Sequence, residues 1–237
     1  MSTKKKTNEA VEIKPIILVT ATVRVVGISP LIVHKWSEKA KKEMLQSMQS
    51  NSKENGPQKK KEREDKRPFM EFVDSLYWLT EKPVADTDAE LQVKFQEAIE
   101  NGARFGFPAT AFKAAAISGA YRRGWVPDKM GLRGAFFIDA DDDGLVEIKG
   151  SAPTMREDPV HIGISGSDLR YRGEFASWYA DLNITYDENG PYTFGDIVNY
   201  LNVGGFVCGV GEWRAERDGQ NGGFQVLGAP EEKKNDH

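Results

Sequence analysis

Two segments far apart in the sequence alternate apolar and polar residues with a period of two. In residues 16–26 the alternating apolar residues are Val19, Ala21, Val23 and Val25. In residues 178–185 they are Trp178, Ala180, Leu182 and Ile184. Successive side chains of a strand point to opposite faces of a sheet, so this pattern is typical of a strand with one face in a hydrophobic core. We therefore predict a core strand at each segment.

Two helices are indicated between and after these strands. Residues 109–123 carry Ala and Phe at spacings that suit a buried helix, with Thr110 as its N-cap and Gly124 at its end. Thr193 and Asp196 resemble a capping box, with Asp in place of the usual Glu, ahead of a second apolar stripe. The sequence therefore predicts two buried helices, one over residues 109–123 and one that begins after Thr193.

Turn signals supply the remaining strands. Residues 134–138 and 145–148 flank an Asp-rich turn that ends in Gly144, which favours a β-hairpin, and residues 224–227 read as a last strand. The order is then strand, helix, strand, strand, helix, strand. This order predicts an α+β fold with a ferredoxin-like (RRM-like) split βαβ core.

A large charged insertion, residues 35–100, follows the first strand. Residues 35–67 are dominated by Lys, Glu, Gln, Ser and Asn, and cannot bury enough apolar surface to order themselves, so we expect a mobile arm. The arm either clamps nucleic acid or is a solvated insertion, and an amphipathic helix over residues 69–79 brings the chain back. We expect a disordered basic tail, one domain and a second disordered tail, over residues 1–15, 16–228 and 229–237.

Composition narrows the class of protein. The chain has 237 residues, of which 39% are hydrophobic, enough for one domain with insertions. Its formal net charge is −4, so affinity for phosphate must come from local clusters of Lys and Arg. Cys208 is the only cysteine, which excludes an internal disulfide and indicates a reducing compartment. Since no stretch approaches the ~18 apolar residues of a membrane span, we expect a cytoplasmic protein with no membrane contact.

Three short segments occur in a fixed order along these elements. Residues 27–31 read Gly-Ile-Ser-Pro-Leu at the end of the first strand, and residues 107–115 form a Pro-containing turn into a helix that carries Lys113. Residues 209–226 form a glycine-rich loop before the last strand. Together these segments resemble the RAMP superfamily, the ferredoxin-like proteins of CRISPR-associated ribonucleoprotein complexes. The resemblance covers the core elements and leaves the insertion unexplained.

The resemblance implies a backbone-type subunit that polymerises along a guide RNA or another single strand. Glycines let the main chain approach a phosphate closely, and neighbouring arginines supply charge. In this loop those residues are Gly209, Gly211, Arg214 and Arg217. Trp213 could stack on a base, worth ~1–3 kcal/mol. The alternative is a glycine-rich turn with Trp213 packed on the core, and the nearby Glu212 and Asp218 count against tight phosphate contact.

Two further basic clusters are candidates for nucleic-acid binding. The first lies on or after the helix over residues 109–123 and comprises Lys113, Arg122, Arg123 and Arg133. The second interleaves an aromatic residue and comprises Arg156, Arg170, Tyr171 and Arg172. The first cluster would form a positive edge for phosphates, and the second, with its aromatic residue, is the better signature of strand binding. The alternatives are solvated charges at a helix end for the first cluster and ordinary cross-strand charges for the second.

Catalytic and metal chemistry find little support in the sequence. Asp139, Asp141 and Asp143 match the start of a calcium loop, but Gly150 occupies its twelfth position, so we predict a turn and no metal site. His34 follows the first strand and is the residue type suited to acid–base work near neutral pH, yet no second catalytic residue is tied to it by spacing. We expect neither an enzyme nor a cofactor.

Four hypotheses for function follow. The first is a sequence-nonspecific binder of single-stranded nucleic acid, with RNA favoured, that assembles as repeated copies or a filament and that could join other CRISPR-type subunits. The second is a phage-type single-stranded DNA-binding protein of recombination or replication. The third is an endoribonuclease that uses His34. The fourth is an interaction protein that mimics or blocks a CRISPR complex.

Overall fold

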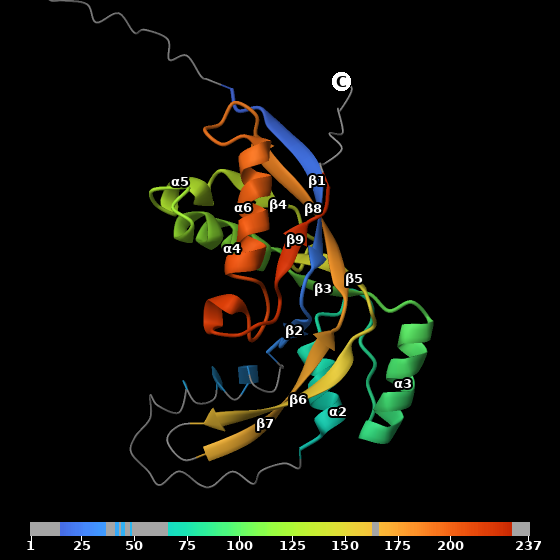
Figure 1. Ribbon diagram of the computed structural model, residues 1–237. Helices are drawn as coiled ribbons and strands as arrows, with labels where there is room; N and C mark the ends of the chain where they lie inside the picture. The colour runs from blue at the N-terminus through green and yellow to red at the C-terminus, as the bar shows by residue number, and fades with distance from the viewer. Residues whose placement is uncertain are drawn as a thin grey trace, which may run out of the picture.

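Within the described residues, the main sheet has six strands (Figure 1). The computed structural model describes residues 15–36, 41–42, 44–45, 48, 66–162 and 166–228, without the side chains of residues 161 and 162. Neighbouring strands run antiparallel in the order β3-β5-β8-β1-β9, and β4 also pairs with β8. The strands are β1 (Leu18–Gly27), β3 (Phe105–Pro108), β4 (Phe136–Ile138), β5 (Leu145–Gly150), β8 (Trp178–Asp187) and β9 (Phe224–Val226).

The two alternating segments form the centre of this sheet, as predicted. Val23 of β1 pairs with Leu182 of β8, and both side chains are buried. The opposite face is polar because the intervening residues pair with one another: the Thr20 and Thr185 hydroxyls lie 2.7 Å apart, and Arg24 bonds Asp181 at 2.7 Å. The guanidinium of Arg24 also covers the ring of Tyr179 at 4.8 Å. The polar groups of this open face therefore largely satisfy each other.

Two helices, α4 (Ala109–Arg122) and α6 (Phe194–Val207), cover the apolar face of the main sheet (Figure 1). The capping box of α6 is confirmed, since the Thr193 and Asp196 side chains each accept a hydrogen bond from the other's backbone N–H. The N-cap prediction for α4 is wrong. The helix begins at Ala109 because the Pro108 turn leads directly into it, so Thr110 lies inside the first turn.

The predicted hairpin over residues 134–148 is also wrong. Strands β4 and β5 both pair with β8, at different positions along it, and not with each other. The segment between them is a turn in which Asp141 Oδ1 accepts hydrogen bonds from the backbone N–H groups of Asp143 and Leu145, at 3.1 and 2.7 Å. A turn that joins two strand segments along one edge carries the same Asp and Gly signals as a hairpin turn.

A second sheet of three strands lies beside the first, in the order β2-β7-β6 (Figure 1). Its strands are β2 (Leu31–Val33), β6 (Thr154–Ile162) and β7 (Gly166–Phe175). Pro159 lies in β6, which among the described strands pairs only with β7, and an edge strand is the position where a sheet tolerates proline. Residues of both sheets belong to one hydrophobic cluster, so the described chain has an α+β fold built on antiparallel sheets.

The insertion contributes α2 (Pro68–Ser75) and α3 (Asp88–Glu100). Helix α2 packs against β7, and it ends earlier than predicted because Trp78 forms a β-bridge with Phe105. The short α5 (Met130–Arg133) and the 3₁₀ helix η1 (Ala215–Arg217) complete the elements. Most of the predicted arm over residues 35–67 and nearly all of both predicted tails lie outside the described residues. Among the helices that are described, none combines the length and apolar character needed to cross a bilayer.

Candidate functional site

The second sheet presents one charged face, which follows from the alternation of its strands. Val33 pairs with Gly173, so His34, the next residue, lies beside Arg172. Arg172 pairs in turn with Arg156 on the third strand. Cross-strand partners, and residues two apart along a strand, project to the same face. We call this surface the polar face, and it comprises His34, Thr154, Arg156, Asp158, Arg170, Arg172 and Glu174.

The opposite face of this sheet packs on α2. A side chain at Gly173 would overlap Leu76 of α2, and Tyr171 is 8% exposed on the same side. Tyr171 therefore points away from Arg170 and Arg172, although the sequence placed all three in one cluster. The physical reason is the period of two along β7, which sends neighbouring residues to opposite faces.

The arginines of the polar face are paired with carboxylates. Arg156 bonds Asp158 at 2.8 Å and Glu174 at 2.7 Å, and these two bonds raise the pKa of its guanidinium. Arg172 Nη1 bonds Asp158 Oδ2 at 3.0 Å, with both side chains buried. Arg170 Nε lies 3.5 Å from Asp168 Oδ2, an ion pair without a hydrogen bond. Much of the positive charge predicted here is thus balanced within the hairpin.

Three nitrogen atoms of the polar face nevertheless have no hydrogen-bond partner among the described residues: His34 Nδ1, Arg170 Nε and Arg172 Nε. A buried polar group without a partner costs about 1–3 kcal/mol, so such groups call for an explanation. Burial lowers the pKa of His34, and the positive charge of Arg172 lowers it further. All three nitrogens are buried, so within the described part of the chain they are unsatisfied and are not themselves exposed to solvent.

The loop before β9 lies against the polar face. The Arg172 guanidinium lies 5.8 Å from the ring centroid of Trp213, a cation–π contact. Trp213 is 43% exposed and has a left-handed backbone, with φ of 51°. The Glu212 N–H donates to Ile32 O at 2.9 Å, which anchors the loop beside β2. The fold thus brings Trp213 and Arg172, which belong to separate sequence clusters, to one place.

The glycines of this loop are required by its own packing. Gly209 and Gly211 have φ values of 67° and 82°, and a Cβ atom at Gly211 would lie 2.5 Å from Ile32 O. A Cβ atom at Gly209 would lie 3.0 Å from Gly222 O. These observations favour the alternative that the glycines serve the packing of the loop, because backbone atoms of Gly222 and Ile32 lie where a side chain would be.

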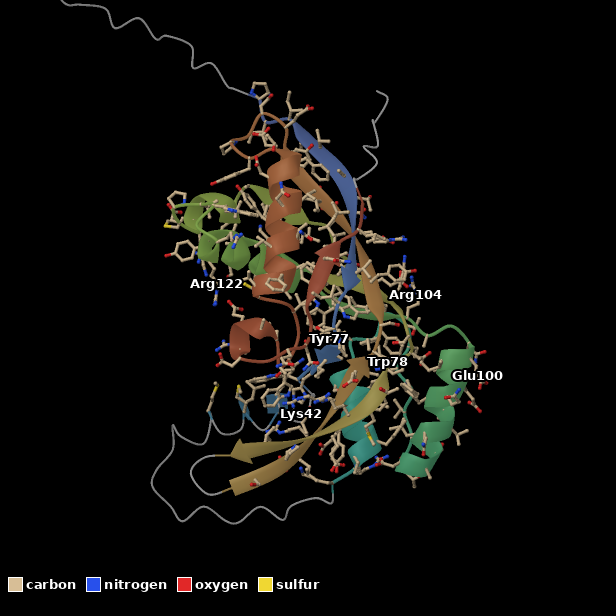
Figure 2. The ribbon with its side chains drawn as sticks, in the orientation of Figure 1. Lys42, Tyr77, Trp78, Glu100, Arg104 and Arg122 are labelled. Carbon is tan, nitrogen blue, oxygen red and sulfur yellow. The ribbon has the colours of Figure 1, made fainter. Side chains whose placement is uncertain are left out.

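One carboxylate, that of Glu216, binds two of the predicted arginines beside the glycine-rich loop. Glu216 of η1 accepts hydrogen bonds from Arg122 at 3.1 Å and from Arg214 at 3.2 Å, and Arg214 also donates to Gly211 O at 3.0 Å. Figure 2 places Arg122 beside η1. The helix-end cluster and the glycine-rich loop are therefore in contact. The contact is made by the Glu216 carboxylate, which neutralises charge that was predicted to bind phosphate.

The remaining residues predicted to bind nucleic acid are Lys113, Arg123, Arg133 and Arg217, and none of them takes part in the contacts described for Glu216. Lys113 Nζ lies 4.2 Å from the ring centroid of Phe137 in β4, and burial lowers its pKa. Arg123 follows α4 as its C-cap, Arg133 ends α5, and Arg217 ends η1. Within the described part of the chain, these three arginines make no ion pair, so their charges face solvent.

Sequence reasoning missed a pocket of about 180 Å³ beside the polar face. Its polar lining consists of His34, Tyr77, Glu212, Arg214 and Glu216. Figure 2 shows Tyr77 near β2, where the two sheets meet. Four separate segments build the pocket, so no local pattern could have revealed it. Of the lining residues, the sequence singled out Glu212 only as an acidic residue that counts against phosphate binding, and not as part of a pocket.

The geometry of the described residues was compared with that of a metal site, and the sequence with known proteins. The described residues contain no group of three His, Cys, Asp or Glu side chains that could hold a metal ion. Asp141 caps its own turn, and Asp139 accepts a hydrogen bond from Thr185 at 3.1 Å. No protein-family model matches the chain, and no curated protein matches it.

Proposed function

We propose that this protein binds single-stranded nucleic acid, with RNA favoured, along the polar face. The observation that carries the proposal is the half-exposed ring of Trp213 against the Arg172 guanidinium, on the same face as the partly exposed side chain of Arg170. Phosphate oxygens accept hydrogen bonds from accessible guanidinium N–H groups, and an exposed indole offers a surface on which any base can stack. The combination suits a strand held by its backbone and by stacking.

We further propose a ferredoxin-like core related to the RAMP superfamily. Without the additional strands, the main sheet has the order β9-β1-β8 followed by β4 and β5, with α4 and α6 on one face. This is the strand order of the split βαβ fold and supports the proposal. In this frame the second sheet is an extension that carries the binding face, and the open face of the main sheet, whose polar groups pair internally, is not used.

The first test measures binding to a labelled single-stranded RNA of mixed sequence at increasing salt. We expect affinity to fall steeply with salt, because bound phosphates release counterions. Replacing Trp213 by Ala should weaken binding roughly 5- to 150-fold through the loss of stacking. The matched control is Trp125→Ala, because Trp125 is 48% exposed and its ring packs beside Tyr200 of α6, so this change should leave affinity unchanged.

Two outcomes would refute the proposal: an affinity that does not change with salt, or equal affinities for the Trp213 and Trp125 variants. Competition between RNA and DNA of one sequence identifies the preferred strand, because only RNA carries the 2′-hydroxyl. Stronger competition by DNA would replace RNA by DNA as the ligand and leave the polar face as the site.

A further inference from the structure

The pocket beside the polar face has one apolar wall and one polar wall. Phe107 and the alanines at one end of α4, including Ala114, form the apolar wall. Its volume of about 180 Å³ lies below the roughly 300 Å³ at which pockets for drug-sized ligands begin. The pocket therefore has room for a single small ring system and is too small for a nucleotide with its sugar and phosphate.

On the polar wall, Arg214 and Glu216 are already bonded to each other. His34, Tyr77 and Glu212 remain. No described residue makes a side-chain hydrogen bond to the Glu212 carboxylate, and His34 Nδ1 also lacks a described partner. His34, Tyr77 and Glu212 all line the pocket. Burial raises the pKa of Tyr77 and the charge of Glu212 raises it further, while the same charge opposes the lowering of the His34 pKa by burial and by Arg172.

We propose that this pocket binds one guanine base, with the Glu212 carboxylate as its main recognition group; this rests on the proposed function, because the base is supplied by the bound strand. Guanine presents two adjacent donors, N1–H and the N2 amino group, to the two oxygens of one carboxylate. Adenine and cytosine place an acceptor nitrogen beside their amino group, and uracil flanks one N–H with two carbonyl groups. Each of these bases would turn a lone pair towards a carboxylate oxygen.

The surrounding groups are consistent with this orientation. Tyr77 Oη and the His34 imidazole can donate to the guanine O6 or N7 acceptors, while Phe107 contacts the ring. His34 belongs both to the pocket and to the polar face, so the sugar and phosphate of the same nucleotide would lie towards Arg172. The backbone bond from Glu212 N–H to Ile32 O fixes the residue that carries the carboxylate.

The test uses the full chain and the four ribonucleoside 5′-monophosphates as separate probes in calorimetric titrations. We expect guanosine monophosphate to bind roughly tenfold or more tightly than the other three, the discrimination typical of a bidentate contact. In Glu212→Gln one acceptor becomes a donor, so the preference for guanine should be lost. Ala114→Leu should weaken all four by filling the pocket at an exposed helix position, and Glu188→Gln, on another exposed loop, is the matched control.

The outcomes separate this inference from the proposed function. If the four monophosphates bind equally or not at all while RNA binding still depends on salt and on Trp213, the guanine pocket is refuted and the strand-binding face stands. Selective binding of guanosine monophosphate with no binding of RNA would retain the pocket and refute the strand. A preference for guanine that survives in Glu212→Gln, with the variant folded by circular dichroism, would also overturn the inference.

Discussion

His34 carries an imidazole whose neutral form the fold favours. Burial lowers its pKa from the ordinary 6.5, Arg172 lowers it further, Glu212 opposes this, and Arg170 adds a smaller lowering. Since the unfolded chain then binds a proton more readily than the folded protein, stability is retained above pH 6.5 and is lost as the pH falls below it, through the lower pKa of the folded state.

We predict that replacing His34 by Gln reduces the loss of stability on acidification. Free energies of unfolding from urea titrations at about pH 8 and about pH 5 give the loss for each chain. The carboxylates titrate in both chains, so the difference between the two losses reports His34. An equal loss in both chains would contradict the assignment of a lowered pKa.

At the scale of elements, α4 and α6 touch through glycines. A Cβ atom at Gly119 would lie 2.5 Å from the Cα atom of Gly204, so the two helix backbones are in direct contact. We predict that Gly119→Ala destabilises the protein by about 1–3 kcal/mol, because forced separation of the helices outweighs the gain in helix propensity.

The matched control is Gly134→Ala. Gly134 has a φ of −95°, and no atom lies within 4 Å of its added Cβ, so we expect a change within about 0.5 kcal/mol. Thermal or urea unfolding measures both variants. Similar effects of the two substitutions would mean that α4 and α6 are not held at the distance described here.

The same elements explain how far the sequence could predict the structure. The central strands and the two helices were predictable because their periodicity and caps are local signals. The arrangement of β4 and β5 was not predictable, because the same Asp and Gly turn residues occur in a hairpin and in a turn between two strands that pair with a third. In the candidate site, the sequence singled out Arg172 and Trp213 in separate clusters, but the contacts of Arg172 with Asp158 and with Trp213 depend on strand register and on a distant loop.

For the molecule as a whole, the distribution of charge at the candidate site can be compared with the net charge of the chain. The formal net charge is −4, and most arginines of the candidate site are paired with carboxylates. If the chain binds a single strand through this site, we expect one copy to contact few phosphates there, and affinity to fall with salt at a logarithmic slope of roughly −0.7 per phosphate contacted. Tight binding of a long strand then requires several copies, which agrees with the proposed assembly along RNA.

We predict that the number of bound copies rises in whole steps with RNA length, whereas the free protein shows no such series. Mass photometry of the protein with RNAs of increasing length resolves these steps, and electron microscopy of the longest complexes should show filaments. Apparent affinity should also rise with length, because neighbouring copies share one strand and the second binding event becomes partly intramolecular. The Trp213→Ala variant should lower occupancy at every length, since each copy uses its own indole. One copy bound at all lengths would contradict assembly and leave a protein that binds a single short segment.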